Sequence, residues 1–114
     1  METFIEKKDE IKIIKLVGDL DGSTAEKTGE KIMNNIEPDI CLIFDLEKCK
    51  YVSSAGLRVL LIAAKKLKKM DGLGVLANME PEVEDVMEMT GFSHMLQSCA
   101  TTEKAVDFLR KERS

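Results

Sequence analysis

The feature that most constrains the fold is the stretch Ile40–Ile62, ICLIFDLEKCKYVSSAGLRVLLI. It begins with an almost continuously apolar run, Ile40–Leu46, which is typical of a strand covered on both faces. From Leu57 onward the apolar residues follow the spacing of a helix face, at Leu57, Leu60, Leu61, Ala64 and Leu67. The sequence therefore predicts a central strand, a short connection and a helix.

Ser53 and Ser54 lie at the junction between this strand and this helix. A serine hydroxyl at that position can cap the helix by accepting a hydrogen bond from an unpaired backbone N–H. The same exposed amides and the helix dipole tolerate a phosphate, which adds charge and acceptor oxygens and changes what can dock there. The residues alone leave two interpretations open: both serines only cap the helix, or one of them is phosphorylated.

Two strands, residues 3–7 and 11–17, are expected before this stretch, joined by a polar connection of hairpin length. In the second strand, Ile11 and Ile13 are predicted to face one side of the sheet, while Ile14 and Leu16 face the other. A helix capped by Ser23 or Thr24 should then run to about residue 36, with Pro38 ending it and its inner face formed by Ala25, Thr28, Ile32 and Ile36.

After the second helix, with its lysine-rich end at residues 65–69, we expect a strand over residues 73–77. A third helix should cover residues 82–90, with Gly91 as its stop and an apolar side formed by Val83, Val86, Met87 and Met89. Met95 and Leu96 are assigned to a last edge strand. A terminal helix capped by Thr101 or Thr102 should face inward through Ala105, Val106, Phe108 and Leu109.

This order predicts an α/β fold with a mixed, mostly parallel sheet of four to five strands and about four helices. The second helix is expected at the centre of the helical layer, because Val59, Ile62 and Ala63 widen its apolar side. The length of 114 residues suits one domain, spanning residues 1–114.

Composition narrows the class of protein. The chain has 21 acidic and 17 basic residues, and its net charge of -4 argues against electrostatic binding of nucleic acid. Neither a secretion signal nor an apolar run of membrane-spanning length is present, so we expect a cytoplasmic protein without a membrane partner. Three widely spaced cysteines, Cys41, Cys49 and Cys99, with a single histidine, fit buried thiols better than disulfides or a zinc site.

Catalytic motifs are weak. Val52-Ser-Ser-Ala-Gly56 lacks the first glycine of a serine hydrolase elbow, and no phosphate-binding loop is present. His94 is expected to be structural or exposed, and Asp19 and Asp21 are expected to form a turn rather than a metal site. We therefore expect no enzymatic activity, cofactor or metal. A hydrolase or phosphoryl-transfer enzyme using Ser53 or Ser54 is the competing class, which burst kinetics abolished by Ser54→Ala would reveal, and small-ligand binding at the same edge stays open.

The residues from Asp45 to Leu61, DLEKCKYVSSAGLRVLL, resemble the signature of STAS domains, especially bacterial anti-sigma factor antagonists. The likeness spans nearly the whole chain. It includes, in the order of the family, Gly18-Asp-Leu-Asp21, Thr24-Ala25, Ser54-Ala-Gly-Leu57, Ala77-Asn78, Pro81 and Thr90-Gly91-Phe92.

The resemblance implies a partner switch. The serine two places before the glycine, here Ser54, is phosphorylated in that family by a cognate anti-sigma factor, a serine kinase of the GHKL type. The unphosphorylated antagonist binds the kinase and frees the sigma factor, and a PP2C-type phosphatase reverses the modification. By the same resemblance, the partner-binding residues are Asp21, Ser23, Thr24, Ser53, Ser54, Ala55, Gly56, Leu57 and Arg58.

The chain departs from the best-known pattern of the family at two positions. Ser53 stands where an aspartate often precedes the modified serine, and Ala55 where a second serine often follows. Ser53 is therefore a minor candidate for phosphorylation. The alternative is an unphosphorylated STAS scaffold or a transporter-associated regulatory module. The free protein is expected to be a monomer.

Overall fold

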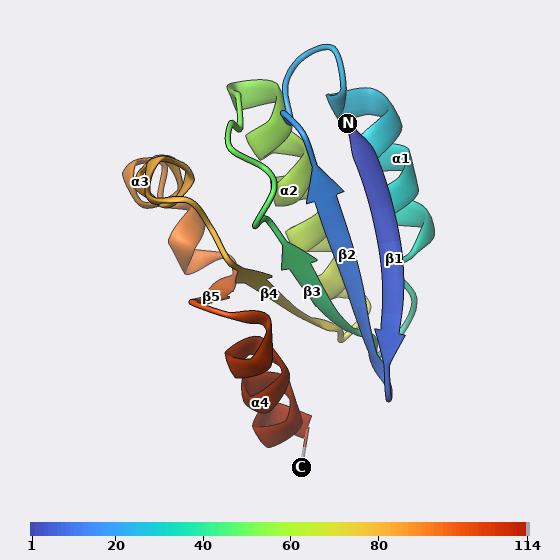
Figure 1. Ribbon diagram of the computed structural model, residues 1–114. Helices are drawn as coiled ribbons and strands as arrows, with labels where there is room; N and C mark the ends of the chain where they lie inside the picture. The colour runs from blue at the N-terminus through green and yellow to red at the C-terminus, as the bar shows by residue number, and fades with distance from the viewer. Residues whose placement is uncertain (114) are drawn as a thin grey trace.

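The computed structural model describes residues 1–113, except for the side chain of Ser93, and has the expected mixed α/β architecture (Figure 1). Its strands are β1 (Glu2–Lys8), β2 (Ile11–Val17), β3 (Cys41–Asp45), β4 (Leu73–Ala77) and β5 (Gln97–Cys99). Its helices are α1 (Ala25–Asn34), α2 (Ser54–Lys69), α3 (Pro81–Met89) and α4 (Thr102–Arg113), with a short 3-10 helix, η1 (Phe92–His94), between α3 and β5.

The five strands form one sheet in the order β1-β2-β3-β4-β5. β1 pairs antiparallel with β2, and every other pair is parallel. The loops that follow β2, β3 and β4 therefore leave the sheet at one end, which we call the carboxyl edge (Figure 1). Helices begin just beyond this edge, because each parallel connection must cross back over the sheet.

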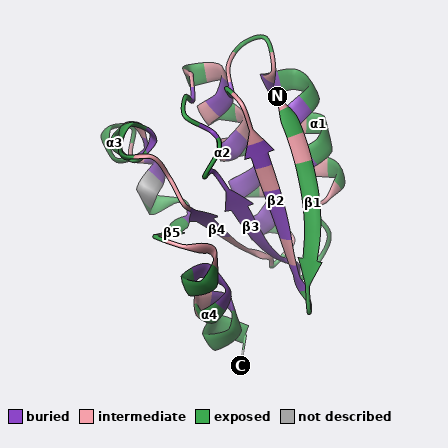
Figure 2. Cartoon of the chain, viewed as in Figure 1, coloured by how far each residue is buried: buried purple, intermediate pink, exposed green. Residues whose placement is uncertain are grey.

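The two faces of the sheet carry different helices. Residues of α1, α2 and α3 pack with Ile14 and Leu16 on one face, whereas α4 packs with Ile11 and Ile13 on the other. The predicted alternation within β2 is therefore confirmed. β3 is buried along its whole length, as Figure 2 shows, because helices cover it from both sides. This confirms the central strand.

The prediction that α2 is central is confirmed, since it lies between α1 and α3 (Figure 1). Its buried face includes Leu60 and Leu67. Val59 faces α1, where a Cβ atom on Gly29 would lie 3.5 Å from its methyl groups. Ile62 differs from the expectation, because 44% of its surface is exposed. The neighbouring helices flank α2 and leave its outward side uncovered.

Two predictions near the C-terminus are wrong. The edge strand is Gln97–Cys99 and not Met95 with Leu96; instead, Leu96 is buried in the core. The polar residues of β5 carry no apolar alternation, so periodicity had no signal to detect there. Met89 was assigned to the apolar side of α3 and is 87% exposed, because this helix is buried through Val83 and Met87, which lie on the other side of the helix.

The remaining sequence expectations concern thiols, the histidine and membrane spans. Cys41, Cys49 and Cys99 are free, the first two buried, and burial raises the pKa of the Cys49 thiol. His94 is exposed in η1. Within residues 1–113, none of the helices combines the length and apolar character needed to cross a lipid bilayer.

Candidate functional site

Two loops at the carboxyl edge pair with each other beyond the sheet: residues 18–24, which follow β2, and residues 46–53, which follow β3. The N–H of Leu20 donates to the carbonyl of Tyr51 at 3.0 Å, and the N–H of Ser53 donates to the carbonyl of Leu20 at 2.9 Å. Leu20 and Val52 thereby form a parallel β-bridge. We call these segments the paired loops. Their backbones are fixed to each other, which places the start of α2 beside the turn that precedes α1.

Gly56 in the first turn of α2 allows this close pairing. A Cβ atom at that position would lie 2.3 Å from the carbonyl oxygen of Leu20 and 2.7 Å from its Cγ. No side chain fits there, so α2 begins in direct contact with the first loop. Glycine costs a helix about 1 kcal/mol relative to alanine, and its presence in an apolar helix is the sequence signal for such a contact. Sequence reasoning assigned Gly56 to the partner surface, whereas the structure buries it between the loops.

The first of the paired loops is held by its own side chains. One carboxylate oxygen of Asp21 accepts hydrogen bonds from the N–H of Ser23 at 2.9 Å and from its hydroxyl at 2.7 Å. The hydroxyl of Thr24 accepts from the N–H of Asp21 at 3.0 Å and donates to the carbonyl of Asp19 at 2.8 Å. The expectation that Asp21 forms a turn is confirmed.

These bonds have two consequences for the loop. The Ser23 hydroxyl, followed by the Ser23 N–H and by Thr24, stabilises the charged carboxylate and holds the pKa of Asp21 below its ordinary value of 3.8. Thr24 occupies the N-cap position of α1 as predicted, yet its side chain makes no capping bond. Its hydroxyl is engaged within the loop instead.

The N-terminus of α2 is capped by Ser53, one of the two serines that the sequence offered for this cap. The Ser53 hydroxyl accepts a hydrogen bond from the N–H of Gly56 at 3.3 Å. The first intrahelical bond runs from the N–H of Leu57 to the carbonyl of Ser53 at 2.8 Å. A helix leaves the N–H groups of its first turn without helical partners. Within residues 1–113, those of Ser54 and Ala55 therefore stay unpaired.

Ser54 is the first residue of α2, and its side chain is exposed. Its hydroxyl forms no hydrogen bond to any of residues 1–113. The first turn of α2 contains no acidic residue, whereas those of α1, α3 and α4 each contain at least one. The positive end of the α2 dipole and two free N–H groups thus lie beside a hydroxyl that is open to solvent, an arrangement that suits an added anion.

The structure brings all nine predicted site residues to the same part of the carboxyl edge. Ser23, Ser54 and Arg58 are exposed, and the half-buried members are Asp21, Thr24, Ser53, Ala55 and Leu57. Only Gly56 is buried. The sequence could not show that residues 21–24 and 53–58 meet, because 28 residues of chain separate them and only the parallel pairing of β2 with β3 brings them together.

A second polar group at the carboxyl edge was not predicted. The Asn78 side-chain amide donates to Asp45 and to the Thr102 hydroxyl, each at 2.9 Å, and so joins the ends of β3 and β4 to the start of α4. Asn78 has a φ of 59°, which asparagine tolerates better than most residues. The adjacent Ala77-Asn78 pair in the sequence gave no indication of these partners.

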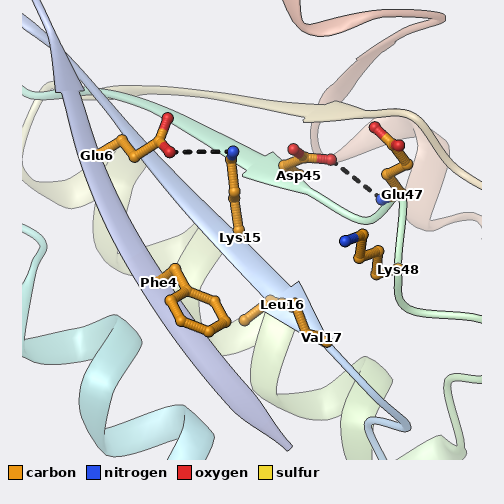
Figure 3. Close-up of a pocket in the computed structure, with 8 residues that line it drawn as sticks. All are labelled: Phe4, Glu6, Lys15, Leu16, Val17, Asp45, Glu47 and Lys48. Atoms are coloured by element: carbon orange, nitrogen blue, oxygen red, sulfur yellow. Dashed lines mark hydrogen bonds and ion pairs between the residues drawn. The ribbon is translucent and has the colours of Figure 1, made fainter.

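Beside Asp45 lies a hollow of about 420 Å³, lined in part by Phe4, Glu6, Lys15 and Lys48 (Figure 3). The Lys15 ammonium contacts Glu6 at 3.0 Å, and this hydrogen bond with its charge attraction raises the pKa of Lys15. None of the nine predicted site residues lines this hollow. The candidate site is instead an exposed surface made of the paired loops and the first turns of α2, which suits contact with another protein.

The chain is similar to known proteins in sequence and in fold. The sequence profile of the STAS domain family matches residues 4–106. A relative from Bordetella bronchiseptica, BtrV, which is named as an anti-sigma factor antagonist, is 31% identical over 106 residues, covering 92% of this chain and 91% of the relative.

Two solved structures share the fold. The crystal structure of an anti-sigma factor antagonist from Mycobacterium paratuberculosis superposes with a TM-score of 0.87 at 23% identity, covering 96% of this chain and 93% of that one. SpoIIAA, a Bacillus cell fate determinant solved in its phosphorylated form, gives a TM-score of 0.69 at 24% identity, covering 95% and 99%. The sequence match over residues 4–106, the identity to BtrV and the shared fold together show that the chain belongs to the STAS domain family.

Proposed function

We propose that this protein is an anti-sigma factor antagonist whose binding is switched off by phosphorylation of Ser54. In this proposal the unphosphorylated form binds a cognate anti-sigma factor serine kinase of the GHKL type in the cytoplasm and releases the sigma factor. A PP2C-type phosphatase restores the active form. The single observation that carries the proposal is the exposed Ser54 hydroxyl, which has no hydrogen-bond partner among residues 1–113 and lies at the start of a helix whose first turn has no acidic residue.

Modification of Ser54 leaves the fold intact in this proposal. The hydroxyl supports no other residue among 1–113, so its loss as a donor removes no internal bond. A phosphate adds a charge of about -1.5 to -2 where the helix dipole and two free N–H groups stabilise it. The effect falls on the partner, which would have to desolvate that charge in order to dock.

Ser53, the minor candidate for phosphorylation, suits the role of the switch residue less well. Its hydroxyl caps α2 through Gly56, so modification there would compete with the cap. The relatives support the antagonist role by their names, and the phosphorylated form of SpoIIAA supports a phosphate on this fold.

The first test is the intact mass of the protein recovered from its native cells under phosphatase inhibition, followed by peptide mapping. We expect a fraction with one added phosphate, located on Ser54. A phosphate found only on Ser53 would move the switch to the neighbouring residue. The absence of phosphate in every growth condition would contradict the proposal and favour an unphosphorylated STAS scaffold or a transporter-associated module.

The second test compares Ser54→Asp with Ser54→Ala in binding to the anti-sigma factor kinase recovered with the Ser54→Ala protein. Charge repulsion and desolvation should weaken binding by Ser54→Asp at least about tenfold, or about 1.4 kcal/mol, with an unchanged thermal midpoint. Isothermal titration calorimetry measures the affinity. Ser98→Asp, an exposed serine in β5, is the matched control and should bind normally. Equal affinity of Ser54→Asp and Ser54→Ala would contradict the switch.

A further inference from the structure

The charge of α2 is opposite to that of the rest of the molecule. The helix carries five basic residues and no acidic one, although the whole chain has a net charge of -4. The remaining residues therefore sum to -9. The basic residues of α2 are Arg58, Lys65, Lys66, Lys68 and Lys69. One helix thus concentrates positive charge on an otherwise acidic protein.

Most of this charge lies on one line that begins at Ser54. Arg58, Ile62, Lys65 and Lys69 follow Ser54 at helical spacing and fall within an arc of about 80° at 100° per residue. Each of these side chains is exposed, and the opposite side of the helix is buried in the core. We call Arg58, Ile62, Lys65 and Lys69 the outer stripe.

Among residues 1–113, the three cations of the outer stripe have no acidic partner. The salt bridges of the described chain involve Lys12, Lys15 and Arg110, and none involves α2. The helix dipole favours the lysines of the last turn. It does not account for Arg58, which lies near the positive end of the helix. Ile62 places an apolar side chain, 44% exposed, between the charges.

We propose that the outer stripe docks an acidic surface of the protein partner, with Ile62 as its apolar contact. This inference rests on the proposed function and extends the partner surface from the first turn of α2 along its length. A protein is favoured over nucleic acid because the exposed Ile62 can pack against an apolar side chain of a protein and contributes little to phosphate binding. Complementary charge would accelerate association and select the partner.

The outer stripe also links docking to Ser54. A phosphate on Ser54 would lie four residues before Arg58, and an anion preceding a cation by four residues is the favoured orientation for an ion pair on a helix. Phosphorylation therefore repels an acidic partner and also engages Arg58 within the helix. The net positive charge available along the outer stripe falls by about 1.5 to 2.

The test uses a synthetic helical peptide with glutamates along one side around a central leucine, and the same peptide with glutamines as its control. In ¹⁵N nuclear magnetic resonance titrations, we expect the glutamate peptide to shift the amides of the outer stripe, with an affinity that falls as salt increases. The combined substitutions Arg58→Glu, Lys65→Glu and Lys69→Glu should weaken binding at least about tenfold.

The matched control carries the same change of charge elsewhere, as Lys7→Glu, Lys8→Glu and Lys104→Glu, all at exposed positions outside α2. Circular dichroism checks that both variants fold. Equal losses in the two variants, or shifts that map away from α2, would overturn the inference. Tighter binding of a single-stranded DNA oligonucleotide or of phosphatidylserine vesicles to the outer stripe would overturn it as well and identify a different partner class.

Failure of this inference can be separated from failure of the proposed function by testing both sets of variants against the anti-sigma factor kinase. If Ser54→Asp weakens kinase binding and the triple variant of the outer stripe does not, the switch stands and the outer stripe has no docking role. If the triple variant abolishes binding and Ser54→Asp has no effect, the outer stripe docks the partner and the phosphorylation switch is wrong.

Discussion

The two segments that meet at the candidate site are held in opposite ways. In the loop that precedes α1, the side chains of Asp21, Ser23 and Thr24 bond to one another and to the local backbone. At the start of α2, Ser53 forms the cap, and the hydroxyl of Ser54 has no partner among residues 1–113. The first segment is a fixed frame, and the second presents an exposed hydroxyl beside it.

This difference separates the residues that maintain the site from Ser54, the residue that we propose is modified. A group that changes its charge during signalling should not support the fold, because its modification would then cost stability. Ser54 meets that condition, because its side chain takes no part in the backbone bonds of the paired loops or in the contact between Gly56 and Leu20. The comparison can be tested by substituting the residues that hold the paired loops and, separately, Ser54.

The largest effect is expected from Gly56→Ala. The added Cβ atom would lie 2.3 Å from the carbonyl oxygen of Leu20, so α2 must move away from the first loop. We expect a loss of about 2 to 3 kcal/mol in the free energy of unfolding, measured by urea denaturation, because overpacking forces the backbone to shift. The matched control is Gly22→Ala, where a Cβ atom meets nothing within 4 Å. Equal stabilities of the two variants would mean that the paired loops are not a rigid frame.

A smaller effect should distinguish the two adjacent serines. Ser53→Ala removes the hydroxyl that accepts from the N–H of Gly56, and loss of an N-cap costs about 1 kcal/mol. Ser54→Ala removes no internal bond and should change the free energy of unfolding by less than about 0.5 kcal/mol. Thermal and urea unfolding of both variants measure the contrast. A larger loss for Ser54→Ala would show that Ser54 supports the fold and would weaken its assignment as the switch residue.

The smallest effect concerns the pH dependence of the frame. The folded-state pKa of Asp21 lies below its ordinary value of 3.8, so its charge stabilises the protein above that value and ceases to do so as the pH falls through the lower folded-state pKa. Asp21→Asn should therefore be less stable than the natural protein near neutral pH, and the difference should shrink below about pH 4. Urea denaturation across this range tests it.

Asp19→Asn provides the control for that series, because the Asp19 side chain makes no hydrogen bond to residues 1–113 and is exposed. Its stability relative to the natural protein should stay nearly constant over the same range of pH. If the stability difference from the natural protein shrinks equally for both variants as the pH falls, the effect comes from the loss of a negative charge and not from the hydrogen bonds that Ser23 donates to Asp21.

Much of the fold could be predicted from local pattern alone. The apolar run at residues 40–46 predicted a strand covered on both faces, and β3 is buried throughout. The alternation of Ile11, Ile13, Ile14 and Leu16 predicted two faces, and the two cores divide these residues as expected. The period of side chains follows directly from backbone geometry, so such assignments need no knowledge of neighbours. Where the pattern was absent, as in the polar β5, the assignment failed.

The sequence by itself determined the helices and every strand except β5, and it placed Ser53 and Ser54 at the junction where α2 begins, because capping and periodicity act between residues close in the chain. Only the tertiary structure decided that residues 18–24 pair with residues 46–53, that Gly56 fits against Leu20, and that α2 turns its cations outward. Those contacts depend on the parallel pairing of β2 with β3 and on the packing of three helices over one face. Long-range packing of this kind leaves no periodic trace in the sequence.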